Sequence, residues 1–140
     1  RHLGRGEGVP AGLAARLRSA QERTAHNSAL TMNIAFNYGG RADIVDAVRR
    51  IVAEGLAPEE ISEETISQRL STAGQPDPDL IIRTAGEMRL SNFLIWQASY
   101  AEFYSTPVYW PDFGREEFLG ALRAFEGRQR RFGRVASPQA

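Results

Sequence analysis

Two arginines and a serine follow a short apolar run in the second half of the chain: Arg83, Arg89 and Ser91. The run at residues 80–82 comes after Pro78 and is typical of a strand that is buried on both faces in a parallel sheet. Arg83 then lies at the carboxyl end of that strand, where ligands bind in open α/β sheets. Because guanidinium groups hold phosphate through a planar fork of donors, the spacing predicts a diphosphate pocket.

The next element is expected to strengthen this pocket. Ser91 is predicted to open a helix that runs to about Tyr100, and the first amide groups and the dipole of a helix favour an anion. The alternative is purely structural, with Arg83 paired to Glu87 or Asp79 and Arg89 as an ordinary surface residue. Spacing alone leaves both interpretations open.

Composition excludes several other kinds of site. The chain has 140 residues, 17 basic and 17 acidic side chains and no net charge, so no global field attracts nucleic acid or an acidic membrane. All the basic residues are arginine, which fits phosphate ligands but also a simple codon bias. Cysteine is absent, which excludes disulfides and thiolate metal sites. His2 and His26 are too few and too far apart for a zinc site.

Hydrophobic periodicity predicts the elements around the loop. Helices are expected at about residues 10–24, 43–53, 62–70 and 91–100, with a last one from about 112 that ends in an arginine cluster. Its buried face would comprise Phe118, Leu119, Leu122 and Phe125. Strands are expected at residues 30–36, 80–82 and within 103–110. This order predicts one domain of α/β class, with a mostly parallel sheet flanked by helices and a disordered tail at about residues 134–140.

Five sequence blocks in one order carry a family resemblance. They are NIAFNYGGR at 33–41, RTAGEMRLSNFLIWQ at 83–97, SYAE at 99–102, WPDF at 110–113 and RRFG at 130–133. Together they resemble the carboxy-terminal part of the cis-prenyltransferases, the undecaprenyl diphosphate synthase family. Met88 departs mildly from the pattern, because many relatives carry a polar residue there. The resemblance implies an undecaprenyl diphosphate synthase-like fold whose amino-terminal portion, with the catalytic aspartate, precedes Arg1, so that this piece alone is expected to be inactive.

The resemblance also implies an activity and a set of site residues. The family condenses isopentenyl diphosphate with an allylic diphosphate to give a cis-polyprenyl diphosphate. The implied substrate-binding residues are Arg83, Arg89, Leu90, Ser91, Arg131 and Gly133, the last two acting across a homodimer. Glu102 is implied as a ligand of Mg²⁺, a cation that fits carboxylate and diphosphate oxygens.

Plainer explanations remain for two of these assignments. Glu102, expected to close a helix, could simply pair with a nearby arginine. Arg131 and Gly133 could complement the helix dipole and form a left-handed cap.

A rival interpretation is a non-catalytic partner subunit of a prenyltransferase with the same fold. Retention of both substrate arginines and of Ser91 favours the enzyme. No apolar run approaches the roughly 20 residues that cross a bilayer, so a soluble protein is expected. Its expected location is the cytoplasm, with which the absence of cysteine is compatible. A peripheral association with membranes through the lipid product stays open.

Overall fold

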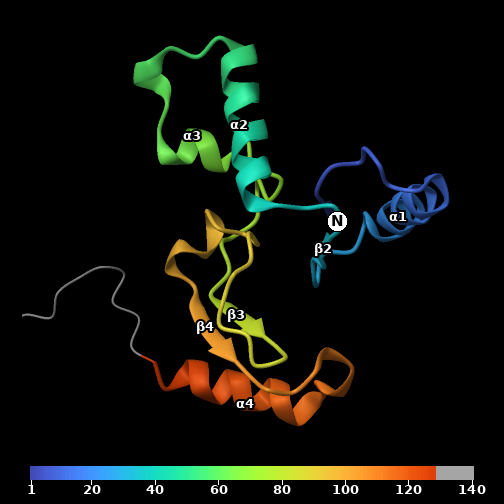
Figure 1. Ribbon diagram of the computed structural model, residues 1–140. Coiled ribbons are helices and arrows are strands. Elements are labelled where there is room, and N and C mark those ends of the chain that lie inside the picture. Colours follow the sequence, from blue (N-terminus) through green and yellow to red (C-terminus); the bar gives the residue numbers. More distant parts are fainter. Residues whose placement is uncertain (129–140) are drawn as a thin grey trace, which may run out of the picture. The chain divides into compact units, whose positions relative to one another are not determined.

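The structure, a computed structural model, describes residues 1–128, and the contacts among them divide the chain into two units (Figure 1). The first unit comprises residues 1–75 together with 92–94, and the second comprises residues 76–91 and those from 95 onward. Each unit contains a pair of parallel strands with helices next to them in sequence. The expected α/β class with parallel strand pairing is therefore confirmed.

The strand pair of the first unit is short. Strand β1 (His2–Leu3) pairs in parallel with β2 (Ile34–Ala35), with His2 opposite Ile34. The strand expected at residues 30–36 is thus confirmed only at residues 34–35, near its carboxyl end. Strand β1 was missed because it lies in a polar, glycine-rich stretch. Gly4 follows β1 with a φ of 120°, and a Cβ there would lie 2.3 Å from the carbonyl oxygen of Phe36. Only glycine fits this close approach.

Two of the predicted helices in this unit are confirmed. Helix α1 (Ala11–Thr24) begins directly after Pro10, whose φ of −54° suits a helix start. Helix α2 (Gly40–Glu54) ends at Gly55, which has a φ of 73° and forms a left-handed cap. The buried side of α2 includes Ala47 and Ile51.

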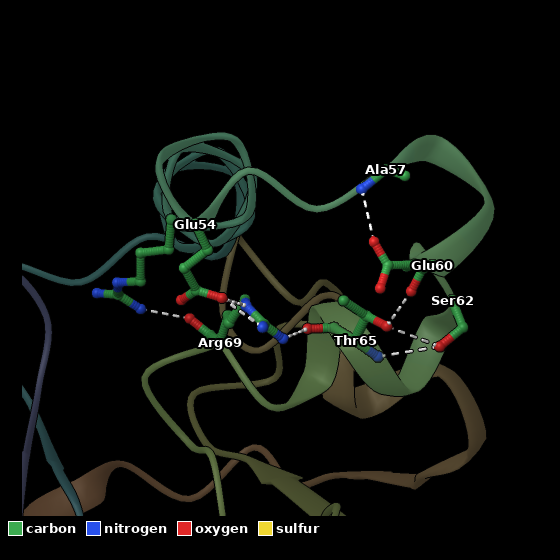
Figure 2. Close-up of polar contacts among 7 residues, drawn as sticks. Glu54, Ala57, Glu60, Ser62, Thr65 and Arg69 are labelled. Atoms are coloured by element: carbon green, nitrogen blue, oxygen red, sulfur yellow. Dashed lines mark hydrogen bonds and ion pairs between the residues drawn. The ribbon is translucent and has the colours of Figure 1, made fainter.

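The connection from α2 to α3 (Glu63–Ser67) is fixed by polar contacts (Figure 2). Ser62 caps α3 by accepting a hydrogen bond of 3.1 Å from the amide of Thr65. Arg69 lies between Glu54 and Thr65 and donates to the carboxylate of the first and, at 2.9 Å, to the carbonyl of the second. The helix expected to reach Leu70 ends at Ser67, and the turns that follow bring Arg69 back to α2.

The second unit is built on strands β3 (Leu80–Arg83) and β4 (Glu102–Ser105), which are parallel. The strand predicted at residues 80–82 is confirmed, and Arg83 is its last residue. The β-prone segment 103–110 is extended only at its start, because the chain bends at Pro107 and Trp110–Asp112 form a 3₁₀ helix.

Helix α4 (Arg115–Glu126) contacts β4. Its fully buried residue is Ala121, whereas Phe118 and Leu122 are exposed by 46% and 39%. The predicted buried face of this helix is therefore wrong at these two positions. The arginine cluster beyond residue 128 and the predicted tail at 134–140 lie outside the described residues.

The helix predicted at residues 91–100 is wrong. Ser91, Asn92 and Leu94 have φ values of 49°, 63° and 45°, which a right-handed helix cannot contain. Only Gln97–Tyr100 form a helical turn, of 3₁₀ type. Asn92 instead caps α2, since its carbonyl oxygen accepts a bond of 2.7 Å from the Gly40 amide and its side chain one of 2.9 Å from the Arg41 amide.

Candidate functional site: two arginines at the end of a parallel strand

The candidate site begins where β3 ends. Arg83 lies opposite Ser105 in the register of the parallel pair, and Thr106 continues the ladder by donating a bond of 2.9 Å to the Arg83 carbonyl. The backbone of Arg83 is thus fixed by pairing with β4. Its side chain, about one third exposed, starts from a rigid position.

The loop after Arg83 is anchored to the segment that follows β4. Ala85 and Gly86 both have positive φ values, 63° and 69°, which turn the chain sharply. Their amide groups are nevertheless satisfied, because Ala85 donates to Val108 at 2.9 Å and Gly86 donates to Thr106 at 2.8 Å. This loop is therefore held at its base rather than hanging free from the strand.

Glu87 lies between the two arginines and contacts both. One carboxylate oxygen accepts a hydrogen bond from Nη2 of Arg83, and the other accepts one of 2.5 Å from Nη2 of Arg89. The hydroxyl of Ser105 donates a bond of 2.9 Å to the backbone carbonyl of Glu87. The three charged side chains carry a net charge of one positive unit, and Arg89 is two thirds exposed, so the group can receive an anion from solvent.

The electrostatics of this cluster keep Glu87 ionised. The hydrogen bond from Arg83 lowers the pKa of Glu87 below its ordinary value; partial burial opposes this, and the positive charges of Arg83 and Arg89 add to it. The carboxylate is therefore charged across the neutral range, and both of its oxygens act as acceptors.

The structure brings Arg83 and Arg89 together, as the sequence predicted. It also contains the Arg83–Glu87 pair that formed the structural alternative, so the two interpretations coexist in one cluster. Leu90 is half-buried and Ser91 is exposed at the end of the same loop. The helix dipole expected at Ser91 does not exist, because its φ of 49° is left-handed.

Glu102 occupies a different place from the one predicted. It is the first residue of β4 rather than the end of a helix, and it lies opposite Leu80 in the register. Since strands rise about 3.3 Å per residue, it is roughly 10 Å along the ladder from Arg83. Arg128 donates to its carboxylate at 2.7 Å and to the Phe103 carbonyl at 3.1 Å, so the alternative of an arginine pair is realised.

The part of the chain that the structure describes does not form a magnesium site by itself. Within residues 1–128 there is no group of three or more histidine, aspartate or glutamate side chains that could hold a metal ion. Glu102 would supply a single ligand, and that carboxylate is engaged by Arg128. Arg131 and Gly133, the other predicted substrate residues, lie outside the described residues.

Sequence reasoning missed two features. The contribution of Ser105 depends on strand register, which no local pattern reveals. The first unit also contains a pocket of about 460 Å³, whose lining includes Arg5, Asp43 and Asp46. Arg5 binds both oxygens of Asp46 at 2.8 Å, and Asp43 accepts two bonds of 2.9 Å from Ser71, so these three charged side chains already have polar partners in the protein.

No helix in the described range 1–128 is both long and apolar enough to cross a membrane.

Comparisons with known proteins agree on a family. The family described as "Putative undecaprenyl diphosphate synthase" matches residues 1–133. An isoprenyl transferase of Heliobacterium mobile is 50% identical over 139 residues, which cover 96% of this chain and 54% of the relative. An isoprenyl transferase of Agrobacterium fabrum is 50% identical over 144 residues, covering 100% of this chain and 58% of the relative. The chain thus spans little more than half the length of these relatives.

Solved structures give the same result. Lavandulyl diphosphate synthase from Lavandula x intermedia, solved in complex with dimethylallyl diphosphate, matches this chain with a TM-score of 0.91 and 42% sequence identity. The match covers 95% of this chain and 59% of the synthase chain. A probable undecaprenyl diphosphate synthase from Campylobacter jejuni matches with a TM-score of 0.84 and 34% sequence identity, over 96% of this chain and 62% of the synthase chain. Both similarities extend over nearly the whole chain.

Proposed function

The chain belongs to the undecaprenyl diphosphate synthase family, and from this premise we propose that the intact protein is an isoprenyl transferase. It condenses isopentenyl diphosphate with an allylic diphosphate and releases diphosphate, giving a cis-polyprenyl diphosphate. The observation that carries this proposal is the meeting of Arg83 and Arg89 at Glu87, beyond the carboxyl end of β3. A relative that binds dimethylallyl diphosphate supports an allylic substrate.

In this proposal Arg83 and Arg89 bind the diphosphate of isopentenyl diphosphate, and Leu90 and Ser91 complete the same loop. Charge-assisted bonds from two guanidinium groups fix the anion and therefore the carbon chain attached to it. Holding the acceptor in place turns the bond-forming encounter into an intramolecular step, which removes much of its entropic barrier.

We propose Mg²⁺ as the cofactor of the intact protein, although residues 1–128 contain no group of three or more side chains that could bind it. Mg²⁺ is commonly bound by one or two carboxylates together with substrate phosphates and water. Glu102 would contribute one oxygen ligand once Arg128 releases it, and the remaining ligands would come from diphosphate and from other parts of the intact protein. Such a cation would neutralise negative charge on the leaving diphosphate.

We also propose a homodimer in which Arg131 and Gly133 reach the partner's substrate. Arginine provides a fixed fork for phosphate, and glycine allows the backbone to approach it closely. We place the protein in the cytoplasm, with contact to membranes arising through the lipid product.

The test is a prenyl-transfer assay with the intact protein, Mg²⁺, isopentenyl diphosphate and farnesyl diphosphate, followed by mass measurement of the products. The proposal predicts products longer than farnesyl diphosphate by whole isoprene units. A protein that makes no such product alone, but raises the activity of a second prenyltransferase subunit, would be the non-catalytic partner instead.

A further inference from the structure

Glu87 makes a contact that the proposed reaction does not require. Each of its carboxylate oxygens receives one hydrogen bond, one from Arg83 and one from Arg89, and each arginine uses the same terminal nitrogen, Nη2. The carboxylate therefore forms a bridge between two cations that would otherwise repel each other.

We propose that Glu87 is a positioning residue for the diphosphate site, which holds the guanidinium groups of Arg83 and Arg89 in one arrangement before the anion arrives. The proposal rests on the proposed function, because it assigns Glu87 a part in binding that same diphosphate. Glu87 acts through the arginines and takes no part in bond making.

The bridge leaves both arginines able to bind. A guanidinium group has five N–H donors, so one bond to Glu87 does not exhaust either side chain. Arginine side chains lose considerable rotamer freedom when they are fixed, and two neighbouring cations also repel each other. Glu87 orders both arginine side chains and offsets their repulsion before the ligand binds. Less conformational entropy of these side chains is therefore lost on binding.

The backbone beneath Glu87 is itself fixed. Ser105 donates to its carbonyl at 2.9 Å, and the adjacent amide of Gly86 donates to Thr106 at 2.8 Å. Both partners belong to β4 or to the residue directly after it, so the bridge is connected to the strand that pairs with Arg83. These two bonds fix the position of the Glu87 backbone relative to the end of β3.

A simple electrostatic argument predicts the opposite effect. A carboxylate next to an anion site repels the ligand and competes for the arginines, so its removal should tighten binding. If Glu87 positions the arginines, its removal should weaken binding although the site becomes more positive. The sign of the change therefore distinguishes the two accounts.

The test uses the variants Glu87→Gln and Glu87→Asp in the intact protein. Glutamine replaces one carboxylate oxygen with an NH₂ group, which cannot accept a hydrogen bond, so it cannot bind each arginine through a separate oxygen as Glu87 does. Aspartate keeps the charge but is one methylene shorter. Glu59→Gln, at an exposed residue of the 3₁₀ helix Pro58–Glu60, makes the same change in net charge and is the matched control.

Binding of inorganic pyrophosphate is measured calorimetrically at fixed ionic strength. We expect Glu87→Gln to weaken pyrophosphate binding about tenfold, since one charge-assisted contact between residue 87 and the two arginines is lost. The affinity of Glu87→Asp should lie between those of Glu87→Gln and the wild type, and that of Glu59→Gln should equal the wild-type value. In turnover, Glu87→Gln should raise KM for isopentenyl diphosphate about tenfold and change kcat by less than about twofold. Ser105→Ala should weaken pyrophosphate binding by about threefold, because it removes one neutral hydrogen bond.

Equal or tighter pyrophosphate binding by Glu87→Gln overturns the positioning role. The parallel variant Arg83→Gln separates this outcome from a failure of the proposed function. If Arg83→Gln weakens binding while Glu87→Gln does not, only the inference about Glu87 is wrong. If wild type and Arg83→Gln bind pyrophosphate alike, the site itself is misassigned and both proposals fall.

Discussion

Asn92 caps the distant helix α2, because its side-chain oxygen accepts a hydrogen bond of 2.9 Å from the backbone amide of Arg41, 51 residues earlier in the sequence. Its backbone carbonyl accepts a second bond from Gly40. The approach is close, since a Cβ on Gly39 would lie 2.8 Å from Nδ2 of the Asn92 side chain. The left-handed backbone of Asn92 is thus part of how α2 begins.

We predict that Asn92→Ala lowers the free energy of unfolding of the intact protein by about 1 kcal/mol, the usual cost of losing a side-chain cap. Asn92→Asp keeps an acceptor oxygen at the amino end of α2 and should retain most of that stability. Urea denaturation of both variants measures the difference. Equal stability of Asn92→Ala and wild type would show that the cap contributes nothing.

The pair Arg5–Asp46 predicts a dependence of stability on pH. The hydrogen bond from Arg5, followed by the charges of Arg5 and Arg49, lowers the pKa of Asp46 in the folded protein despite partial burial. This contribution is present above the unfolded-state pKa of about 3.9 and is lost as the pH falls through the lower folded value. Asp46→Asn should therefore lower Tm at about pH 7, and the difference should vanish as the pH falls through the lowered pKa of Asp46 in the folded protein.

Thermal unfolding of wild type and Asp46→Asn across this range provides the measurement. Glu22→Gln, at an exposed residue of α1, is the control and should show no such convergence. A difference in Tm that stays constant down to low pH would contradict the ionic origin of the effect.

The ion pair between Glu102 and Arg128 gives a prediction about magnesium. If Glu102 is a metal ligand in the intact enzyme, Glu102→Gln raises the Mg²⁺ concentration needed for half-maximal turnover. Arg128→Gln frees the carboxylate and lowers that concentration. Magnesium titrations of prenyl transfer measure both shifts, and identical titration curves for all three proteins would leave Glu102 with a purely structural pairing.

The proposed sharing of sites between subunits predicts complementation. One subunit carries Arg131→Ala and the other Arg83→Ala, so a shared arrangement places both lesions in one pocket and leaves the second pocket intact. The mixed dimer should then recover activity that neither mutant homodimer has. No recovery after confirmed mixing of subunits would contradict action across the interface.

Local patterns predicted the elements whose signals are local. Pro10, Gly55 and Ser62 mark helix ends through backbone geometry or capping, and each marks its helix in the structure. The apolar run before Arg83 likewise predicted both strand β3 and the position of the first arginine, although its residues are half-buried rather than buried on both faces. These signals depend on a few neighbouring residues and can therefore be recognised in a single sequence without knowledge of distant contacts.

The errors arose where distant contacts override local preference. Residues 91–100 have helical periodicity, yet the capping of α2 by Asn92 requires a backbone that no right-handed helix provides. Glu102 was assigned to a helix end because the register of β4 against β3 cannot be read from composition. Glu87 was considered only as a pairing partner, since its contact with both arginines depends on the loop that Ser105 and Thr106 anchor.

The most direct test of the central claim is the effect of Arg83→Gln and Arg89→Gln on steady-state kinetics of the intact protein. Arg115→Gln, at an exposed arginine that begins α4, removes the same charge outside the site and is the control. The account predicts that each site variant raises KM for isopentenyl diphosphate by about tenfold or more, because a charge-assisted contact is lost, and leaves KM for the allylic substrate nearly unchanged. Unchanged KM for isopentenyl diphosphate in both variants, or an increase confined to the allylic substrate, would contradict it.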